Sequence, residues 1–191
     1  MSEVYKEGKE FFNEDFSEHP LEKGDYEDCI FKNCSLAGTD LSDIVFIECT
    51  FEQCDLSNVD LKGTAFRDIT FASCKMLGLH FEVCNEFLFE VKFRQCQLNM
   101  SSFYERNLQG CSFDSCSLVE VDFGEADLTK ASFKNCDLSG ASFEYTKLEQ
   151  ADFRTANNYV INPEINQIKK ARFSSQGLAG LLTNYDIIIE Y

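Results

Sequence analysis

Large apolar residues recur at every fifth position along most of this chain. A first series of fourteen runs without a break from Phe16 to Phe81, and a second series of fourteen runs from Leu88 to Phe153. The two series are displaced by two residues near positions 84–87. A helix repeats every 3.6 residues and a strand every two, so a period of five predicts short extended segments separated by corners.

A longer period of twenty lies on top of the period of five. Phe31, Phe51 and Phe71 are twenty residues apart, and cysteines follow the same spacing in two columns. Four five-residue units therefore make one coil, and about seven coils at a strand spacing of about 4.8 Å form a rod about 34 Å long. We predict an all-β, four-sided parallel solenoid with these core residues: Phe31, Phe51, Phe71, Phe93, Phe113, Phe133, Cys34, Cys54, Cys74, Cys96, Cys116 and Cys136.

The repeat spans residues 14–155 and predicts one domain with a cap at each end. Residues 1–13 place Phe11 and Phe12 among polar side chains, a pattern typical of an amphipathic N-terminal cap. A cap is expected because the end coils of a solenoid expose unpaired backbone groups.

Residues 156–191 predict a C-terminal cap. The pattern indicates one more repeat at 171–173, a short helix beginning at Ser174 or Ser175, and a strand at 186–190. Three consecutive isoleucines favour burial of that strand on both faces, which a second copy of the chain would provide. The C-terminal cap is therefore a candidate homodimer contact.

Acidic residues outnumber basic ones. The 33 Asp and Glu against 17 Lys and Arg give a formal net charge of −16. This charge argues against binding to nucleic acid or to anionic membranes and favours a protein partner with a basic surface. The sequence has no apolar run long enough for a signal peptide or for a membrane span of about 20 residues. We therefore predict a cytoplasmic protein whose ten cysteines are reduced thiols.

Residue types that carry catalysis or bind metals have no suitable spacing. Cysteines five residues apart, such as Cys29 and Cys34, lack the two-residue spacing of common zinc sites and are expected to fill the core. His19 and His80 have no recognisable nucleophile or metal ligand beside them. The sequence has no glycine-rich phosphate loop, and a filled solenoid offers no substrate pocket. We predict no enzymatic activity, no cofactor and no metal.

Glu86 and Arg106 form an unusual pair of positions. They lie twenty residues apart, each two residues before a centre of the second series, where side chains point inward. We predict an ion pair between them on adjacent coils. In the alternative, the displacement at 84–87 turns Glu86 outward and leaves Arg106 on the surface. In either case the extra residues are expected to bulge or kink the rod.

Two stretches contain acidic residues and no Lys or Arg, and their acids are the candidate partner-binding residues. These acids lie outside the inward positions and are expected to be solvated. They are Asp40, Asp43, Glu48, Glu52, Asp55, Asp60, Asp114, Glu120, Asp122, Glu125 and Asp127. Two roles are open: binding of a specific partner, or solubility of the rod together with capping of corners by Asp side chains just before each centre.

Several repeats resemble the pentapeptide-repeat family, whose consensus is Ala-(Asp/Asn)-Leu-X-X. The resemblance is carried by units such as ADLTK, ASFKN, CDLSG, ASFEY and ADFRT and covers residues 14–155. It implies a right-handed quadrilateral β-helix. The tail, with INPEIN at 161–166 followed by Gly177 and Leu178, is also similar to the end of the microcin B17 immunity protein. That protein and the Qnr quinolone-resistance proteins act on DNA gyrase, and the family is known for acidic rods that mimic duplex DNA.

Two functions are open from the sequence. One is a non-enzymatic DNA mimic that binds DNA gyrase or another type II topoisomerase and modulates it or protects it from a quinolone or toxin. The other is a generic cytosolic interaction scaffold without topoisomerase activity, because a fold does not determine a function. The projecting loops of many Qnr proteins are missing apart from the two-residue displacement. A contiguous acidic side with basic residues elsewhere would favour mimicry, and interspersed charges would favour the scaffold.

Overall fold

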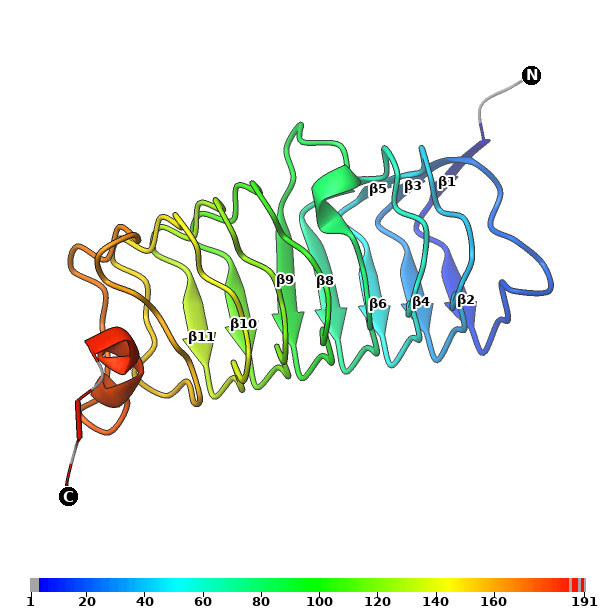
Figure 1. Cartoon of the computed structure of the whole chain (residues 1–191). Coiled ribbons are helices and arrows are strands. Elements are labelled where there is room, and N and C mark those ends of the chain that lie inside the picture. The colour runs from blue at the N-terminus through cyan, green and yellow to red at the C-terminus, as the bar shows by residue number, and fades with distance from the viewer. Residues whose placement is uncertain (1–3, 186, 189, 191) are drawn as a thin grey trace.

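The chain folds into a four-sided parallel β-solenoid, the all-β architecture that the five-residue period predicts. The computed structural model describes residues 4–185, 187, 188 and 190. Its coils stack along one axis in about seven turns, and the longer of its two sheets takes one strand from each of seven successive coils (Figure 1).

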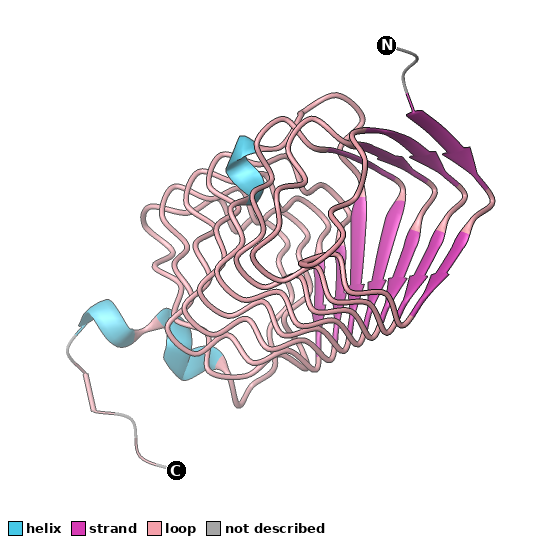
Figure 2. Ribbon diagram, turned by 90° about the vertical axis from the view of Figure 1, so that its right-hand side faces the viewer, coloured by secondary structure: helices cyan, strands magenta, loops and turns pink. Residues whose placement is uncertain are grey.

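Two sheets meet along one edge of the solenoid, and the other two sides consist of loops (Figure 2). The long-sheet face has seven parallel strands: β2 Glu10–Phe12, β4 Ile30–Lys32, β6 Thr50–Glu52, β8 Ile69–Ala72, β9 Val91–Arg94, β10 Ser112–Asp114 and β11 Ser132–Lys134. The short-sheet face begins with four: β1 Val4–Glu7, β3 Gly24–Glu27, β5 Val45–Ile47 and β7 Ala65–Arg67.

Isolated β-bridges join the coils on the two loop sides. The leucine face is centred on Phe16, Leu36, Leu56, Met76, Leu98, Leu118 and Leu138. The acidic face is centred on Leu21, Leu41, Leu61, Phe81, Phe103, Phe123 and Phe143, and residues 161–165 continue it. Along the chain the order is short-sheet, long-sheet, leucine and acidic face. The acidic face therefore lies opposite the long-sheet face.

Corner residues adopt the left-handed backbone region two positions after a centre. Asn33, Gln53 and Ser73 have φ of 52°, 55° and 55°. For residues other than glycine this conformation costs about 1–2 kcal/mol each. Most corner N–H groups donate to a carbonyl of the next coil, as that of Asn33 does to the Glu52 carbonyl at 2.9 Å. Stacking of the coils therefore offsets the strain of the corners.

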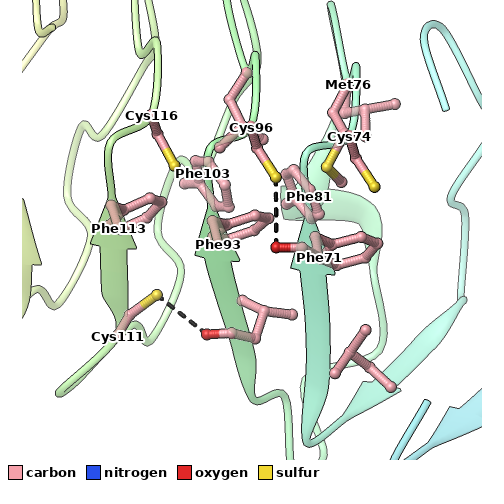
Figure 3. Close-up of a cluster of buried hydrophobic side chains, with 14 of the residues drawn as sticks. Phe71, Cys74, Met76, Phe81, Phe93, Cys96, Phe103, Cys111, Phe113 and Cys116 are labelled. Atoms are coloured by element: carbon pink, nitrogen blue, oxygen red, sulfur yellow. Dashed lines mark hydrogen bonds between the residues drawn. The ribbon is translucent and has the colours of Figure 1, made fainter. Parts of the chain in front are cut away.

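Phenylalanine rings stack along the core. On the long-sheet face the ring centroids of Phe71 and Phe93 are 5.4 Å apart, and those of Phe93 and Phe113 are 5.2 Å apart. A second stack inside the acidic face includes Phe81 and Phe103 at 4.4 Å, and it meets the first stack edge-on (Figure 3). Such aromatic pairs contribute about 0.5–1.5 kcal/mol each beyond the burial of area. The long-sheet stack contains all six phenylalanines of the predicted core: Phe31, Phe51, Phe71, Phe93, Phe113 and Phe133.

The six cysteines of the predicted core form one column and are at most 3% exposed: Cys34, Cys54, Cys74, Cys96, Cys116 and Cys136. The sequence pattern divides this column in two, but a single coil of 22 residues connects its halves, as the pairing of Thr70 with Lys92 shows. The Cys54 thiol donates to the Phe31 carbonyl at 3.3 Å. Thr and Ser occupy the equivalent position of pentads on other faces and donate in the same way. The thiols therefore satisfy corner carbonyls as well as filling space.

The two extra residues of the long coil form a bulge at 86–89 on the short-sheet face. Backbone pairing with the preceding coil is regular at Asn85 and resumes at Glu90. Between them Leu88 has a φ of 56° and is 64% exposed, so the prediction that it is an inward centre is wrong. Two extra residues cannot be accommodated within the five-residue spacing, and the chain turns outward. Phe89 packs against the core in place of Leu88.

The predicted ion pair between Glu86 and Arg106 does not form. The bulge turns Glu86 into solvent, whereas Arg106 is 4% exposed, so the alternative with Arg106 on the surface is also wrong. The Arg106 Nε atom donates to the Phe81 carbonyl at 2.7 Å, and Nη2 donates to the carbonyls of Glu82 and Cys84. Arg106 therefore fills the space inside the bulge and satisfies the carbonyls that surround it.

The described part of the predicted N-terminal cap, residues 4–13, belongs to the first coil. β1 pairs in parallel with β3, and β2 pairs with β4. The Phe11 ring stacks on that of Phe31 at 4.7 Å. These residues have the same strand pairing and ring stacking as the later repeats, so they extend the solenoid rather than form a separate cap.

The C-terminal residues add one repeat before the chain leaves the solenoid. The ring of Phe173 stacks on that of Phe153 at 5.4 Å, as the additional repeat predicts. Two short 3₁₀ helices follow, η2 Leu178–Leu181 and η3 Thr183–Tyr185, which begin later than the helix predicted from Ser174. Within the described residues, neither these nor any other helix is long and apolar enough to cross a membrane.

The strand predicted at 186–190 is not found in its described residues. Ile187 and Ile188 lie outside any strand and are 54% and 90% exposed. Residues 186 and 189 lie outside the described part of the chain. A strand needs a neighbouring edge for its backbone hydrogen bonds, and Ile187 and Ile188 form no backbone hydrogen bond with another described residue. The homodimer contact through this segment stays a prediction.

Candidate functional site: the acidic face

The acidic face concentrates the negative charge of the solenoid. Its ten acidic residues are Glu22, Asp40, Asp43, Asp60, Glu82, Glu105, Asp122, Glu125, Glu144 and Glu164, and its two lysines are Lys23 and Lys62. The adjoining leucine face carries six acids against one lysine: Glu14, Asp15, Glu18, Asp55, Glu120 and Asp137 against Lys75. These two faces form one continuous acidic side.

Basic residues gather on the opposite, long-sheet face. Seven basic residues lie there: Lys9, Lys32, Lys92, Arg94, Lys134, Arg154 and Arg172. Four acids accompany them: Glu10, Glu52, Asp114 and Asp152. The charges are therefore segregated between the acidic side and the long-sheet face, whereas the short-sheet face mixes ten acidic with seven basic residues.

The structure distributes the eleven candidate acids over all four faces. Asp40, Asp43, Asp60, Asp122 and Glu125 lie on the acidic face, Asp55 and Glu120 on the leucine face, Glu48 and Asp127 on the short-sheet face, and Glu52 and Asp114 on the long-sheet face. The last two pair with lysines of their own face, Glu52 with Lys32 at 3.1 Å and Asp114 with Lys134 at 2.8 Å. The prediction of one common face is therefore wrong for the four acids on the two sheet faces.

The sequence analysis missed five acids of this face: Glu22, Glu82, Glu105, Glu144 and Glu164. They lie outside the two acidic stretches that contain the eleven candidates. They become recognisable when pentads twenty residues apart, or 22 across the bulge, are compared, because every coil then carries an acid on this face.

Aspartates just before a centre cap the corners. The Asp40 carboxylate accepts the Ser42 N–H at 2.8 Å, and the Asp122 carboxylate accepts the Gly124 N–H at 2.8 Å. Asp55, Asp60 and Asp127 accept an N–H two residues ahead in the same way. The corner-capping role is confirmed for these five candidates. Each uses one carboxylate oxygen for that bond.

Ion pairs with lysine neutralise only the N-terminal end of the acidic face. Lys6 contacts Glu22 at 3.1 Å, and Lys23 contacts Asp40 at 2.8 Å. Hydrogen bonds from Lys23 and Ser42 lower the pKa of Asp40 to about 2. From residue 43 to residue 164, all of which the structure describes, no Lys or Arg forms an ion pair with an acid of this face. Apart from Glu82, which contacts His80 and has its second carboxylate oxygen buried, these acids are available to a basic partner.

Two tyrosines stand among the acids. The Tyr104 hydroxyl donates to Glu125 at 2.8 Å, and this hydrogen bond raises the pKa of Tyr104 to about 12. Tyr145 is 65% exposed. Tyrosine is enriched in protein interfaces because it offers a large contact area together with a polar end. The face thus combines negative charge with aromatic contact surface.

Within the described residues, no group of three or more His, Cys, Asp and Glu side chains is placed to hold a metal ion. His80 lies at the acidic face with its Nδ1 atom 2.7 Å from Glu82 Oε1. The groups that this surface presents are carboxylates and tyrosine rings, which suit binding of a basic protein surface.

The comparisons with known proteins agree with this architecture. The family described as "Pentapeptide repeat region" matches residues 24–103, 44–123 and 106–181. HetL, a pentapeptide repeat protein involved in heterocyst differentiation regulation from the cyanobacterium Nostoc sp. Strain PCC 7120, has 16% sequence identity and a TM-score of 0.57, covering 91% of this chain and 88% of that chain. Full-length QnrB1, a plasmid-mediated fluoroquinolone resistance protein, has 17% identity and a TM-score of 0.40, covering 96% of this chain and 100% of that chain.

None of the curated proteins matches this sequence. The family match nevertheless extends over most of the solenoid, from residue 24 to residue 181, and the likeness to HetL shows the same fold. On this evidence the chain belongs to the pentapeptide repeat family.

Proposed function

We propose that this protein is a DNA mimic that binds DNA gyrase, or a related type II topoisomerase, through its acidic face, and that it modulates the enzyme or protects it from a quinolone or a toxin. The observation that carries the proposal is the segregation of charge between the acidic side and the long-sheet face. The similarity of the tail, INPEIN at 161–166, to a gyrase-directed member of the family supports the choice of partner.

The charge density of the acidic side is close to that of DNA. The acidic and leucine faces together carry sixteen acids and three lysines, a net of thirteen negative charges. From the level of Glu22 to that of Glu164 there are seven coil steps, or about 34 Å at about 4.8 Å per step. The acidic side therefore carries one net charge per about 2.6 Å of the solenoid axis. This spacing lies between about 3.4 Å per charge for one DNA strand and about 1.7 Å per charge for the duplex.

The protein would act by occupancy rather than by catalysis. A topoisomerase binds DNA on a basic surface, and a rod of similar charge density competes for that surface. Binding to such a surface releases counterions from both partners, so the affinity falls with salt. The proposed partner also places this protein in the cytoplasm, where gyrase acts on the chromosome.

DNA supercoiling by purified gyrase tests the proposal, with increasing protein, with and without a fluoroquinolone, and at two salt concentrations. We expect inhibition of supercoiling or protection from the drug that weakens as salt rises. No effect of the wild-type protein at tens of micromolar would overturn the proposal and favour a generic interaction scaffold instead.

A matched pair of triple variants assigns the effect to one face. Asp43→Asn, Glu105→Gln and Glu144→Gln remove three exposed charges from the acidic face. Glu10→Gln, Glu52→Gln and Asp114→Asn remove three from the long-sheet face. We expect the first variant to weaken the effect on gyrase and to make it less sensitive to salt, because fewer charges then face the partner. Equal losses in both variants would show that net charge, and not this face, is responsible.

A further inference from the structure

The bulge at 86–89 presents two large apolar side chains to solvent. Phe87 is 65% exposed and Leu88 is 64% exposed. After η1, Phe81–Val83, the chain rises above the neighbouring coils before it enters β9 (Figure 1). Single exposed apolar residues are ordinary on protein surfaces. Two adjacent ones at the tip of the coil that breaks the repeat indicate a contact site.

The turn that carries this tip is held by its own hydrogen bonds. The Asn85 side-chain oxygen accepts the Phe87 N–H at 2.9 Å, and the Phe89 N–H donates to the Glu86 carbonyl at 3.3 Å. Leu88 has a φ of 56°, a conformation that disfavours leucine. Corner residues of the other coils, such as Asn33 and Gln53, adopt the same conformation.

Two arginines from the neighbouring coils support the bulge. The guanidinium carbon of Arg67 lies 5.4 Å from the centroid of the Phe87 ring, and that of Arg106 lies 5.2 Å from the centroid of the Phe89 ring. Arg106 is also bonded to three carbonyls at 81–84. A tip that is ordered before binding loses little conformational entropy when a partner covers it.

Acidic side chains border the tip. Glu86 and Glu105, both exposed, line one hollow beside the bulge together with Leu88 and Phe89. Glu105 is one of the ten acids of the acidic face. The apolar tip is therefore continuous with that face, and a partner that covers it meets negative charge at its border.

We propose that Phe87 and Leu88 form a hydrophobic anchor that inserts into an apolar pocket with a basic border on the protein that binds the acidic face. The anchor rests on the proposed function, because the acidic face supplies the attraction and the anchor adds to it. DNA has no projecting apolar group of this kind. The anchor therefore distinguishes the partner from other proteins with basic DNA-binding surfaces and slows dissociation from it.

Binding kinetics with purified DNA gyrase as the probe test the anchor. The Phe87→Ser/Leu88→Ser variant is expected to raise Kd at least about tenfold, mainly through faster dissociation, with an unchanged salt slope. The control is Phe12→Ser/Ile30→Ser, which replaces two exposed apolar side chains, 55% and 39%, on the long-sheet face. It should change Kd less than about twofold, because contacts outside the hot spot contribute little.

A conservative variant separates apolar contact from loss of structure. Phe87→Leu/Leu88→Met keeps the tip apolar and is expected to bind within about threefold of wild type. Wild-type affinity in Phe87→Ser/Leu88→Ser would overturn the anchor and leave the acidic-face proposal standing, provided that neutralising Asp43, Glu105 and Glu144 still weakens binding. No binding of the wild-type protein to gyrase would overturn both proposals.

Discussion

Replacing Arg106 with methionine tests whether the bulge depends on a buried cation. The Arg106 side chain is 4% exposed and donates to the carbonyls of Phe81, Glu82 and Cys84. Methionine keeps an apolar stem of similar length but donates no hydrogen bond. The Arg106→Met variant therefore leaves three carbonyls in or beside the core without their partner.

Opposing energies set the size of the effect. A hydrogen bond from a charged donor contributes about 1.5–3 kcal/mol, so three contribute about 4.5–9 kcal/mol. The variant also avoids the desolvation of a buried guanidinium group, which costs several kcal/mol. We expect a net loss of about 3–5 kcal/mol, because each carbonyl left without its donor costs about 1–3 kcal/mol and the avoided desolvation offsets part of the sum. Such a loss is a large part of a typical total stability of about 5–15 kcal/mol.

Urea unfolding followed by circular dichroism measures the overall loss, and hydrogen exchange locates it. Solenoids can unfold in parts, so we expect the amides of Asn85 and Glu90, which flank the bulge, to exchange faster than those of distant coils. The control is Arg154→Met, because Arg154 is exposed and pairs with Asp152 at 2.7 Å. It should cost less than about 1 kcal/mol. An Arg106→Met protein within about 1 kcal/mol of wild type, with normal exchange at the bulge, would refute the reasoning.

Two further predictions concern the stack and the corners. Phe113→Ala opens the ring stack between Phe93 and Phe133 and is expected to cost about 3–5 kcal/mol in urea unfolding. The control Phe12→Ala, at a 55% exposed position, should cost less than about 1 kcal/mol. Equal losses of stability in Phe113→Ala and Phe12→Ala would contradict the assignment of Phe113 to an inward position. Hydrogen bonds hold the pKa of Asp40 at about 2, through Lys23 and Ser42, and lower that of Asp137, chiefly through Ser139. Since these values lie below the unfolded value of about 3.9, their stabilising effect is complete above about pH 4 and is lost as the pH falls towards 2. The midpoint of urea unfolding should therefore fall as the pH is lowered through this window, and it should fall less in Asp40→Ala. A constant midpoint between about pH 5 and pH 2.5 would contradict the lowered pKa values.

The inward side chains could be predicted from the sequence because their spacing depends only on local geometry. A chain that turns a corner every five residues returns every fifth side chain to the same side, whatever its neighbours are. Phe31, Phe51 and Phe71 are therefore recognisable without any knowledge of the contacts between them. The same reasoning predicts the additional repeat at 171–173, which the stacked ring of Phe173 confirms.

The conformation of the bulge depended on tertiary contacts. By its spacing Leu88 continues the second series, and Glu86 and Arg106 stand at equivalent positions twenty residues apart. Nothing in that spacing distinguishes a Leu88 that points inward from one that points outward. The carbonyls of Phe81, Glu82 and Cys84 in the preceding coil bind the Arg106 guanidinium in the core, and Phe89 packs where Leu88 was expected. Two local arrangements fit the same sequence pattern, and contacts with the neighbouring coil determine which of them forms.

The distribution of charge also became visible only in three dimensions. Nearness along the chain grouped Glu52 with Asp55 and Asp114 with Glu120, but each corner moves the chain to another face. Glu52 and Asp114 thus face lysines of the long-sheet face, and Glu105 and Glu144 join Asp122 on the acidic face. The composition alone determined that the protein is strongly acidic and that its partner should be basic. The segregation of those acids onto one side follows from the coil length, because residues twenty or 22 positions apart stack on one face while residues five apart lie on adjacent faces.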